Sequence, residues 1–181
     1  MTLATPAGAD LKQAFRLCLG SFPTGVCVVT SDRDGRPAGM TLNSFISVSL
    51  EPLLVLVSLG HGSRTLDAVR ASARFAVSML HRGQREVAVD FASPTGIFPE
   101  AHVARTEAGF LLVRHALAYL VCQVDSMVRA GDHDLVVGRV IDFGATPGEP
   151  LVFHAGQFGG VAPDSKAPAG FAAFLDEEIG W

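Results

Sequence analysis

The feature that most constrains the fold is a series of short extended runs, each closed by a turn signal. Residues 24–31 are rich in β-branched side chains, the Asp-Arg-Asp-Gly sequence at 32–35 is typical of a turn, and residues 36–41 form a second run. This pattern predicts a hairpin. Residues 45–50 alternate apolar and polar side chains like a half-buried strand, and residues 53–59 read as a more fully buried strand.

The second half of the chain continues in the same way. Strands are predicted at residues 75–80, 117–128, 135–143 and 151–154, with a hairpin connection at 129–134. Helical spacing appears at residues 10–19, after the N-cap Ser63, and at 84–91, whereas 93–105 reads as a long surface loop. So many strands beside so few helices do not form a βαβ series. The sequence therefore predicts a mainly β, antiparallel barrel.

Composition sets the broad class of the protein. The chain has 181 residues, of which 49% are hydrophobic and 18% charged, so it suits one globular domain and not a disordered segment. A net charge of −4 argues against nucleic-acid binding, and the low charged fraction favours an oligomer that covers apolar surface. We expect a domain over residues 1–163 and a tail over 164–181, flexible or docked on a partner subunit, with a weak helix at 171–179.

The cysteine pattern and the lack of a recognisable targeting signal favour a reducing compartment. Cys18, Cys27 and Cys122 are odd in number and widely spaced, which predicts free, buried, reduced thiols and neither a disulfide framework nor a metal site. Neither a signal peptide nor a membrane segment is recognisable in the sequence. We therefore expect a soluble cytoplasmic protein that uses no metal.

The first segment that suggests chemistry runs from residue 37 to 49. It brings Thr41, Asn43, Ser44, Ser47 and Ser49 into an otherwise apolar stretch. Buried polar groups need hydrogen-bond partners, and the edge of a flat heterocycle would supply them. Ordinary alternation with solvent-facing hydroxyls is the competing interpretation.

Three shorter segments are individually weak signals. Residues 58–65 (SLGHGSRT) precede a helix and would suit a phosphate, although Ser63 would equally serve as a simple N-cap. The Gly-Asp-His sequence at 131–133 has the composition of a hairpin tip. The glycines at 154–160 would let a ligand approach the backbone or would simply end a strand. No phosphate-binding loop, dinucleotide fingerprint, zinc-protease motif or nucleophile elbow is present.

Taken in order, these segments resemble the flavin reductase family with the FMN-binding split-barrel fold, the reductase component of two-component flavin monooxygenases. The resemblance runs from about Phe15 to Val161, roughly 80% of the chain. The matching pieces include the sequences GSFPTGV at 20–26, TLNSF at 41–45, SVSLEP at 47–52, SRT at 63–65, RFAV at 74–77, GDH at 131–133 and GQF at 156–158. The resemblance implies an antiparallel Greek-key split barrel, a homodimer, FMN or FAD as the flavin, reduction by NAD(P)H, and transfer of reduced flavin to a separate monooxygenase.

The resemblance also implies roles for particular residues. Those expected to line the isoalloxazine ring are Gly39, Met40, Thr41, Asn43 and Ser44. Those expected along the ring and ribityl chain are Ser58, Leu59 and Gly60, and those expected to hold the phosphate are Ser63, Arg64 and Thr65. Asp90 and Phe91 would close that end of the groove, and the nicotinamide would meet His133, Phe158 and Gly159.

Three functions remain open at this point. The leading one is an NAD(P)H:flavin oxidoreductase, which suits a chain without acid–base machinery because hydride transfer between two cofactors mainly requires positioning. NADH is favoured over NADPH because no arginine stands out as a clamp for the 2′-phosphate. The second is a non-catalytic flavin-binding electron carrier on the same fold. The third, a split-barrel oxidase acting on a pyridoxine phosphate, ranks low because no basic cluster beyond Arg64 is visible for a second phosphate.

Overall fold

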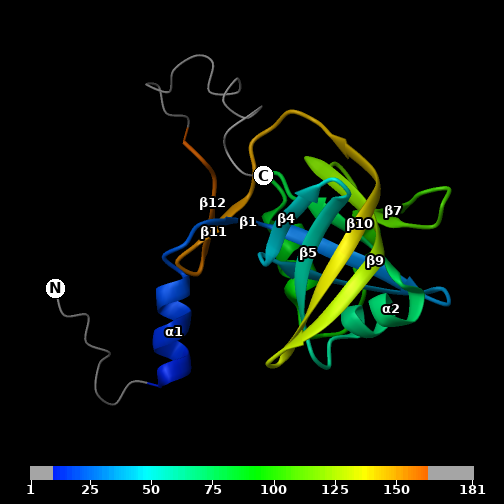
Figure 1. Cartoon of the computed structure of the whole chain (residues 1–181). Helices are drawn as coiled ribbons and strands as arrows, with labels where there is room; N and C mark the ends of the chain where they lie inside the picture. The colour runs from blue at the N-terminus through cyan, green and yellow to red at the C-terminus, as the bar shows by residue number, and fades with distance from the viewer. Residues whose placement is uncertain (1–9, 163–181) are drawn as a thin grey trace.

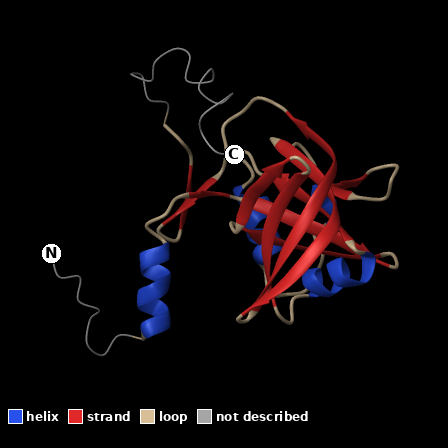
Figure 2. Ribbon diagram, in the orientation of Figure 1, coloured by secondary structure: helices blue, strands red, loops and turns tan. Residues whose placement is uncertain are grey.

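A computed structural model describes residues 10–162 of the chain, which form a large curled sheet with helices against it and a smaller projecting part (Figures 1 and 2). The sheet is seven-stranded, with the order β3-β2-β6-β9-β10-β5-β4 and antiparallel pairing throughout. Its strands are β2 (Cys27–Arg33), β3 (Arg36–Leu42), β4 (Phe45–Leu50), β5 (Leu53–Gly60), β6 (Arg74–Met79), β9 (Ala118–Ala130) and β10 (His133–Ala145). The predicted mainly β, antiparallel class is confirmed.

The core fills the inside of this sheet. Val29, Val57, Phe75 and Val136 are fully buried there, and the helix α2 (Arg64–Ser72) adds Leu66 from one side. A second cluster forms where α3 (Arg85–Ala92) packs near a short two-stranded sheet of β7 (Val103–Arg105) and β8 (Leu111–Val113). We call the seven strands, α2, α3, β7 and β8 the barrel.

A second part, which we call the arm, projects from the barrel at the left of Figure 1. It consists of α1 (Leu11–Leu19) and a three-stranded sheet of β1 (Thr24–Gly25), β11 (Val152–His154) and β12 (Gln157–Gly159). Asp10 caps α1 by accepting a hydrogen bond from the Lys12 amide, and the Ala155 amide donates to the Gly20 carbonyl over 2.9 Å. No residue of α1 is buried.

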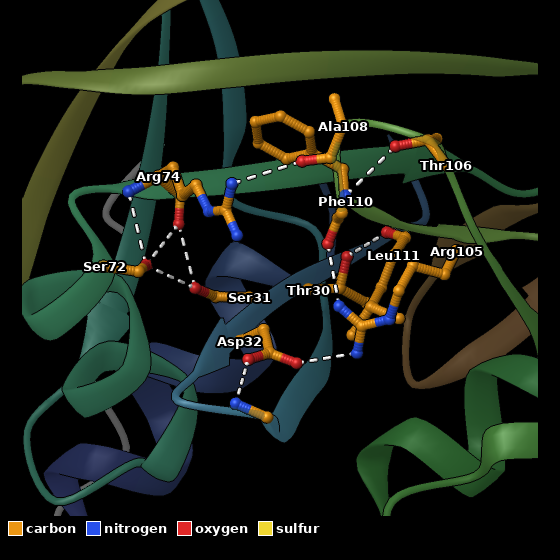
Figure 3. A network of polar contacts seen from close by, with 12 residues as sticks. Thr30, Ser31, Asp32, Ser72, Arg74, Arg105, Thr106, Ala108, Phe110 and Leu111 are labelled. Carbon is orange, nitrogen blue, oxygen red and sulfur yellow. Dashed lines mark hydrogen bonds and ion pairs between the residues drawn. The ribbon is translucent and has the colours of Figure 1, made fainter.

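A network of polar contacts fixes the turn between β2 and β3 (Figure 3). Asp32 accepts hydrogen bonds from the Gly35 amide and from Arg105, each over 2.7 Å. Ser31 donates to the Arg74 carbonyl over 2.8 Å, which joins β2 to the start of β6. Burial raises the pKa of Asp32, but the hydrogen bonds from Arg105 and Gly35 outweigh it and leave the pKa below its ordinary value. The turn is therefore anchored on the rest of the barrel.

Several predictions about individual elements were wrong. Residues 24–31 are not one strand, because Val26 separates β1 in the arm from β2 in the barrel. The loop predicted for 93–105 contains a short 3₁₀-helix (Glu100–His102) and β7, and β8 and β12 were not predicted. The connection predicted at 129–134 shortens to residues 131–132, because both flanking strands continue to the turn.

Two burial predictions also need correction. β5 is buried only at alternate residues, because one of its faces looks away from the core. β4, expected to be half-buried, is mostly exposed in the single chain because it is an edge strand, with a bulge between Ser47 and Ser49. Cys27 and Cys122 are buried free thiols as predicted, whereas Cys18 is exposed on α1.

Two further expectations concern the C-terminal tail and membrane-spanning segments. The weak helix predicted at 171–179 and the tail at 164–181 lie outside the described residues. Among residues 10–162, no helix is long and apolar enough to cross a membrane.

Candidate functional site

Three segments that are far apart in the sequence line one cavity of about 420 Å³ on the barrel. They are residues 37–41 of β3, residues 62–65 at the start of α2, and residues 90–99 at the end of α3 and in the following loop. The cavity thereby gathers Gly39, Met40, Thr41, Ser63, Arg64, Thr65, Asp90 and Phe91, all of which were predicted site residues. Its size falls within the range of about 300–1,000 Å³ typical of ligand sites.

Gly39 shapes one wall of this cavity. A Cβ at this position would lie 2.8 Å from Phe91 Cε1 and 3.2 Å from Phe98 Cε2, closer than packed atoms approach. The two rings pack edge to face with their centroids 5.5 Å apart. The missing side chain thus lets two aromatic rings come against the backbone of β3, which makes this wall apolar.

The opposite end of the cavity is polar and carries a positive charge. Ser63 caps α2 by accepting a hydrogen bond from the Leu66 amide over 3.2 Å. Arg64 follows and donates a hydrogen bond to the Gly96 carbonyl of the loop, and the buried Thr65 also lines the cavity. Helix N-termini favour anions because their first amides lack intrahelical partners. Together with Arg64, this end suits a phosphate.

Two side-chain contacts hold the segments in place. Thr41 donates a hydrogen bond to the Ala88 carbonyl over 2.7 Å and so connects β3 to α3. Asp90 and His102 Nε2 are 2.7 Å apart, which joins the end of α3 to the 3₁₀-helix. The cavity therefore has a fixed frame, and residues of the loop at 93–99 line part of it.

A second, smaller and mainly apolar cavity of about 210 Å³ adjoins the first. Thr41 lines both cavities, and Asn43 and Phe158 line only the second. Phe158 packs edge to face on Phe153, with a centroid distance of 5.4 Å, and lies beneath Arg85. The structure thus brings the arm's β11 and β12 to the edge of the predicted site.

The remaining predicted residues line neither cavity. Ser44 donates a hydrogen bond to the Ser58 carbonyl over 3.1 Å, and the side chain of Leu59 is fully buried in the core, so only its backbone is available to a ligand. Gly60 pairs with His133 across β5 and β10. Gly159 ends β12 opposite Val152.

His133 lies at the tip of the β9–β10 hairpin. Its Nδ1 is 2.7 Å from Asp132 Oδ1, and this contact with His133 holds the pKa of Asp132 below its ordinary value. Nearby, the nearly buried Asp134 lies 2.7 Å from His61 Nε2 and 2.6 Å from Arg70. Hydrogen bonds from His61 and then Arg70 lower the pKa of Asp134.

Sequence reasoning missed the loop that completes the larger cavity. Ser93, Pro94, Ile97, Phe98 and Pro99 line it, and Ile97 is 77% exposed. The available signal was a pair of aromatic or branched apolar residues between two prolines in an otherwise polar stretch. The Asp134 network was also missed, because its three members are widely separated in sequence.

The residues present fit a flavin bearing a phosphate. A planar ring needs an apolar wall and polar groups along one edge. Gly39 and Phe91 supply the apolar wall, and Thr41 lines the cavity as a polar group. An arginine and a helix N-terminus at the other end suit the phosphate.

Comparison with known proteins shows a family match and similar relatives. Residues 19–162 match the family model described as "Flavin reductase like domain". The chain is 36% identical over 161 residues to the reductase subunit HsaB of a flavin-dependent monooxygenase from Mycobacterium tuberculosis H37Rv, covering 87% of this chain and 86% of that one. It is 36% identical over 152 residues to the FMN reductase (NADH) SmoA of Agrobacterium fabrum, covering 84% and 87%.

A solved structure agrees. The NADH:FAD oxidoreductase SgcE6 of Streptomyces globisporus C-1027, in complex with NAD and FAD fragments, superimposes with a TM-score of 0.82 at 36% identity, covering 92% of this chain and 100% of that one. Both the fold and the match over most of the chain support the resemblance on which the site was predicted. This chain belongs to the family of flavin reductase like domains.

Proposed function

We propose that this protein is an NADH-dependent flavin reductase that supplies reduced FMN or FAD to a separate monooxygenase. One observation carries the proposal: within a chain of this family, a single cavity joins an aromatic wall at Gly39 to a cationic helix start at Arg64. The relatives named above are an NADH-dependent FMN reductase and a monooxygenase reductase subunit. A partner oxygenase is therefore part of the proposal.

The residues of the cavity would act by position. Arg64, the capped start of α2 and Thr65 would bind the phosphate, while Gly39, Phe91 and Thr41 would orient the ring. The flavin, held there by these residues, would supply the hydride-accepting ring. Phe91 and Phe98 would exclude water from the side of the ring that they cover, which limits competing reactions.

The nicotinamide is assigned to the side of the site near the arm. Phe158 lines the smaller cavity beside Asn43, and Gly159 follows it in β12. His133, 46% exposed at the β9–β10 tip, is the proposed nucleotide contact on the other strand pair. We expect His133→Ala to raise the KM for NADH and to leave flavin affinity nearly unchanged; a loss of flavin affinity alone would contradict this role.

We also propose that two copies associate as a homodimer. The apolar face of α1 and the edge strand β4 are both uncovered in the single chain, with Leu11, Phe15, Ile46 and Leu50 exposed. Patches of this kind usually mark an interface. Light scattering on the purified chain tests the proposal, and a monomer at micromolar concentration would contradict it.

The test of the function itself combines turnover with binding. The full chain should oxidise NADH continuously when FMN or FAD is added, and removing the flavin should stop it. Arg64→Ala should weaken FMN binding by about ten-fold or more, since a charge-assisted hydrogen bond to phosphate is worth about 1.5–3 kcal/mol. Riboflavin, which lacks the phosphate, should bind both forms equally, and equal losses would refute the phosphate role.

The same assay separates the reductase from the non-catalytic electron carrier. A carrier would bind flavin but would not sustain NADH oxidation with a large excess of free flavin. The names of the relatives do not favour the carrier. A cytoplasmic location stays a prediction, which fractionation of the producing cells would test.

A further inference from the structure

We propose that a third cavity, next to the larger cavity of the flavin site, binds the adenylate half of FAD, so that the protein prefers FAD to FMN. This inference rests on the proposed function, because it extends the same flavin site. The cavity measures about 350 Å³ and is lined by Arg33, Arg36, Pro37, Ala38, Arg64, Asp67 and Ala68. No predicted role used Arg33 or Arg36.

The two cavities are adjacent. They share Pro37, Ala38 and Arg64, so Arg64 lies on the boundary between them. FMN ends at its phosphate, whereas FAD continues from that phosphate into a second phosphate, a ribose and an adenine. A flavin whose first phosphate is held at Arg64 would therefore place in the third cavity only the part that FAD has beyond FMN.

The charge of the third cavity suits a phosphate. Three arginines line it against the single carboxylate of Asp67. Among residues 10–162, no carboxylate lies within ion-pair distance of Arg33, Arg36 or Arg64. Arginine is the side chain best suited to phosphate oxygens, because its planar fork donates two parallel hydrogen bonds.

The two unpaired arginines also face each other. Arg33 and Arg36 are cross-strand partners at the end of the β2–β3 hairpin. Like charges directly opposite one another destabilise a strand pair. An anion between or beside them would remove that cost.

The hairpin that carries them is already fixed. Asp32, the carboxylate beside Arg33, is engaged by Arg105 and by the Gly35 amide (Figure 3). It is therefore not the partner of Arg33 or Arg36. The arginine side chains extend from an anchored turn, which reduces the entropy lost when they bind.

This arrangement corrects the expectation that no basic cluster exists beyond Arg64. Arg33 and Arg36 precede Arg64 by about thirty residues, and only the packing of the hairpin beside α2 brings the three into one cavity. Pro37, Ala38 and Ala68 supply an apolar floor on which an adenine can lie.

Isothermal titration calorimetry of the full chain with riboflavin, FMN and FAD tests the inference without relying on turnover. We expect FAD to bind about ten-fold or more tightly than FMN. Arg33→Gln and Arg36→Gln should each weaken FAD binding by roughly five- to ten-fold and leave FMN binding unchanged. Both positions are exposed at strand ends beside the turn, so the variants should fold, which circular dichroism will verify.

A matched control is Arg114→Gln. Arg114 is an exposed arginine after β8 that lines none of the cavities described here, so its loss changes the net charge equally. It should leave FAD affinity at the wild-type value. An equal loss in Arg114→Gln would show that only overall charge matters and would overturn the site.

Other outcomes are equally decisive. Equal affinities for FMN and FAD, or equal losses of both in the arginine variants, would overturn the inference while leaving the flavin reductase intact. An effect of Arg33→Gln and Arg36→Gln on the KM for NADPH alone would assign the cavity to the 2′-phosphate of that nucleotide and would also overturn it. Failure of all three flavins to bind would instead refute the proposed function.

Discussion

The barrel and the arm bury their apolar residues to very different degrees. In the barrel, Val29, Phe75 and Val136 have no exposed surface. In the arm, no residue of α1 is buried, and Phe15 is 61% and Phe22 74% exposed. Both parts carry apolar side chains, yet those of α1 are buried in neither core cluster.

This difference in burial indicates where each part obtains its stability. Burying a large apolar side chain contributes about 1.5–3 kcal/mol, so the barrel gains stability within one chain. The arm makes a few backbone contacts, such as the one from Ala155 to Gly20, and leaves its apolar face uncovered. The barrel therefore draws stability from its own core, whereas burial of the apolar face of α1 would require the proposed second copy.

Gly138→Ala should produce the largest effect, because it strikes the barrel core. A Cβ there would lie 2.4 Å from Phe75 Cζ and 3.0 Å from Cys122 Cβ, and neither neighbour has room to move. Overpacking of this kind lowers the free energy of unfolding by about 1–3 kcal/mol, measured by urea denaturation.

The arm offers the matched control, Gly25→Ala. A Cβ at Gly25 meets no atom within 4 Å, so its stability should stay within about 0.5 kcal/mol of the wild type. If both alanines cost the same, the barrel core is not the main source of stability.

Phe15→Asp tests whether the arm depends on association. A charge on the apolar face of α1 should weaken the dimer by about ten- to hundred-fold in Kd, because it removes a buried aromatic contact worth about 1.5–3 kcal/mol. Sedimentation at several concentrations measures the shift. The unfolding midpoint of the barrel at high dilution should not change; a large drop there would mean that α1 supports the barrel directly.

Acid should weaken the barrel through two aspartates that are nearly buried and paired with half-exposed arginines. The folded-state pKa values of Asp32 and Asp134 are both lowered, so the unfolded chain binds more protons in the acid range. Stability should therefore hold above the ordinary aspartate pKa and decline as the pH falls toward the lowered values. Asp134→Asn should flatten the decline seen in thermal unfolding; an unchanged profile would exclude this ion-pair contribution.

The reactivity of the cysteines compares the barrel with the arm, and we expect the smallest effect here because no change in stability is involved. Burial raises the pKa of Cys27 and of Cys122 to about 12, so these barrel thiols should resist alkylation until the protein unfolds. Cys18 lies in α1 near the face that carries Phe15. Its alkylation, followed by mass spectrometry, should be slow in the wild type and fast in Phe15→Asp; equal rates would mean that this face of α1 is not covered.

The sequence predicted best what local pattern determines. The alternation and turn residues located β2 to β6 and the β9–β10 hairpin, and Ser63 was the N-cap as expected. β7, β8 and β12 were missed because three residues show too little alternation to distinguish a strand from a loop. Val26 was not recognisable as a break, because the change from arm to barrel depends on pairing with distant strands.

The site shows the same division. The resemblance selected the β3, α2 and α3 segments that meet in the larger cavity. Neither the loop around Phe98 nor the position of Arg33 and Arg36 beside Arg64 was predicted, because both depend on how elements pack and not on spacing along the chain. Packing also explains why Leu59 offers only its backbone, since its side chain belongs to the core.

The contact between Arg64 and the Gly96 carbonyl has a dynamic consequence. A guanidinium has five N–H donors in a fixed plane, so one side chain can hold this carbonyl and an anion together. The loop at residues 93–99 and an anion in the cavity would thus both be held by Arg64. Amide hydrogen exchange in residues 93–99 will slow when an anion fixes that arginine and will quicken when the arginine is lost.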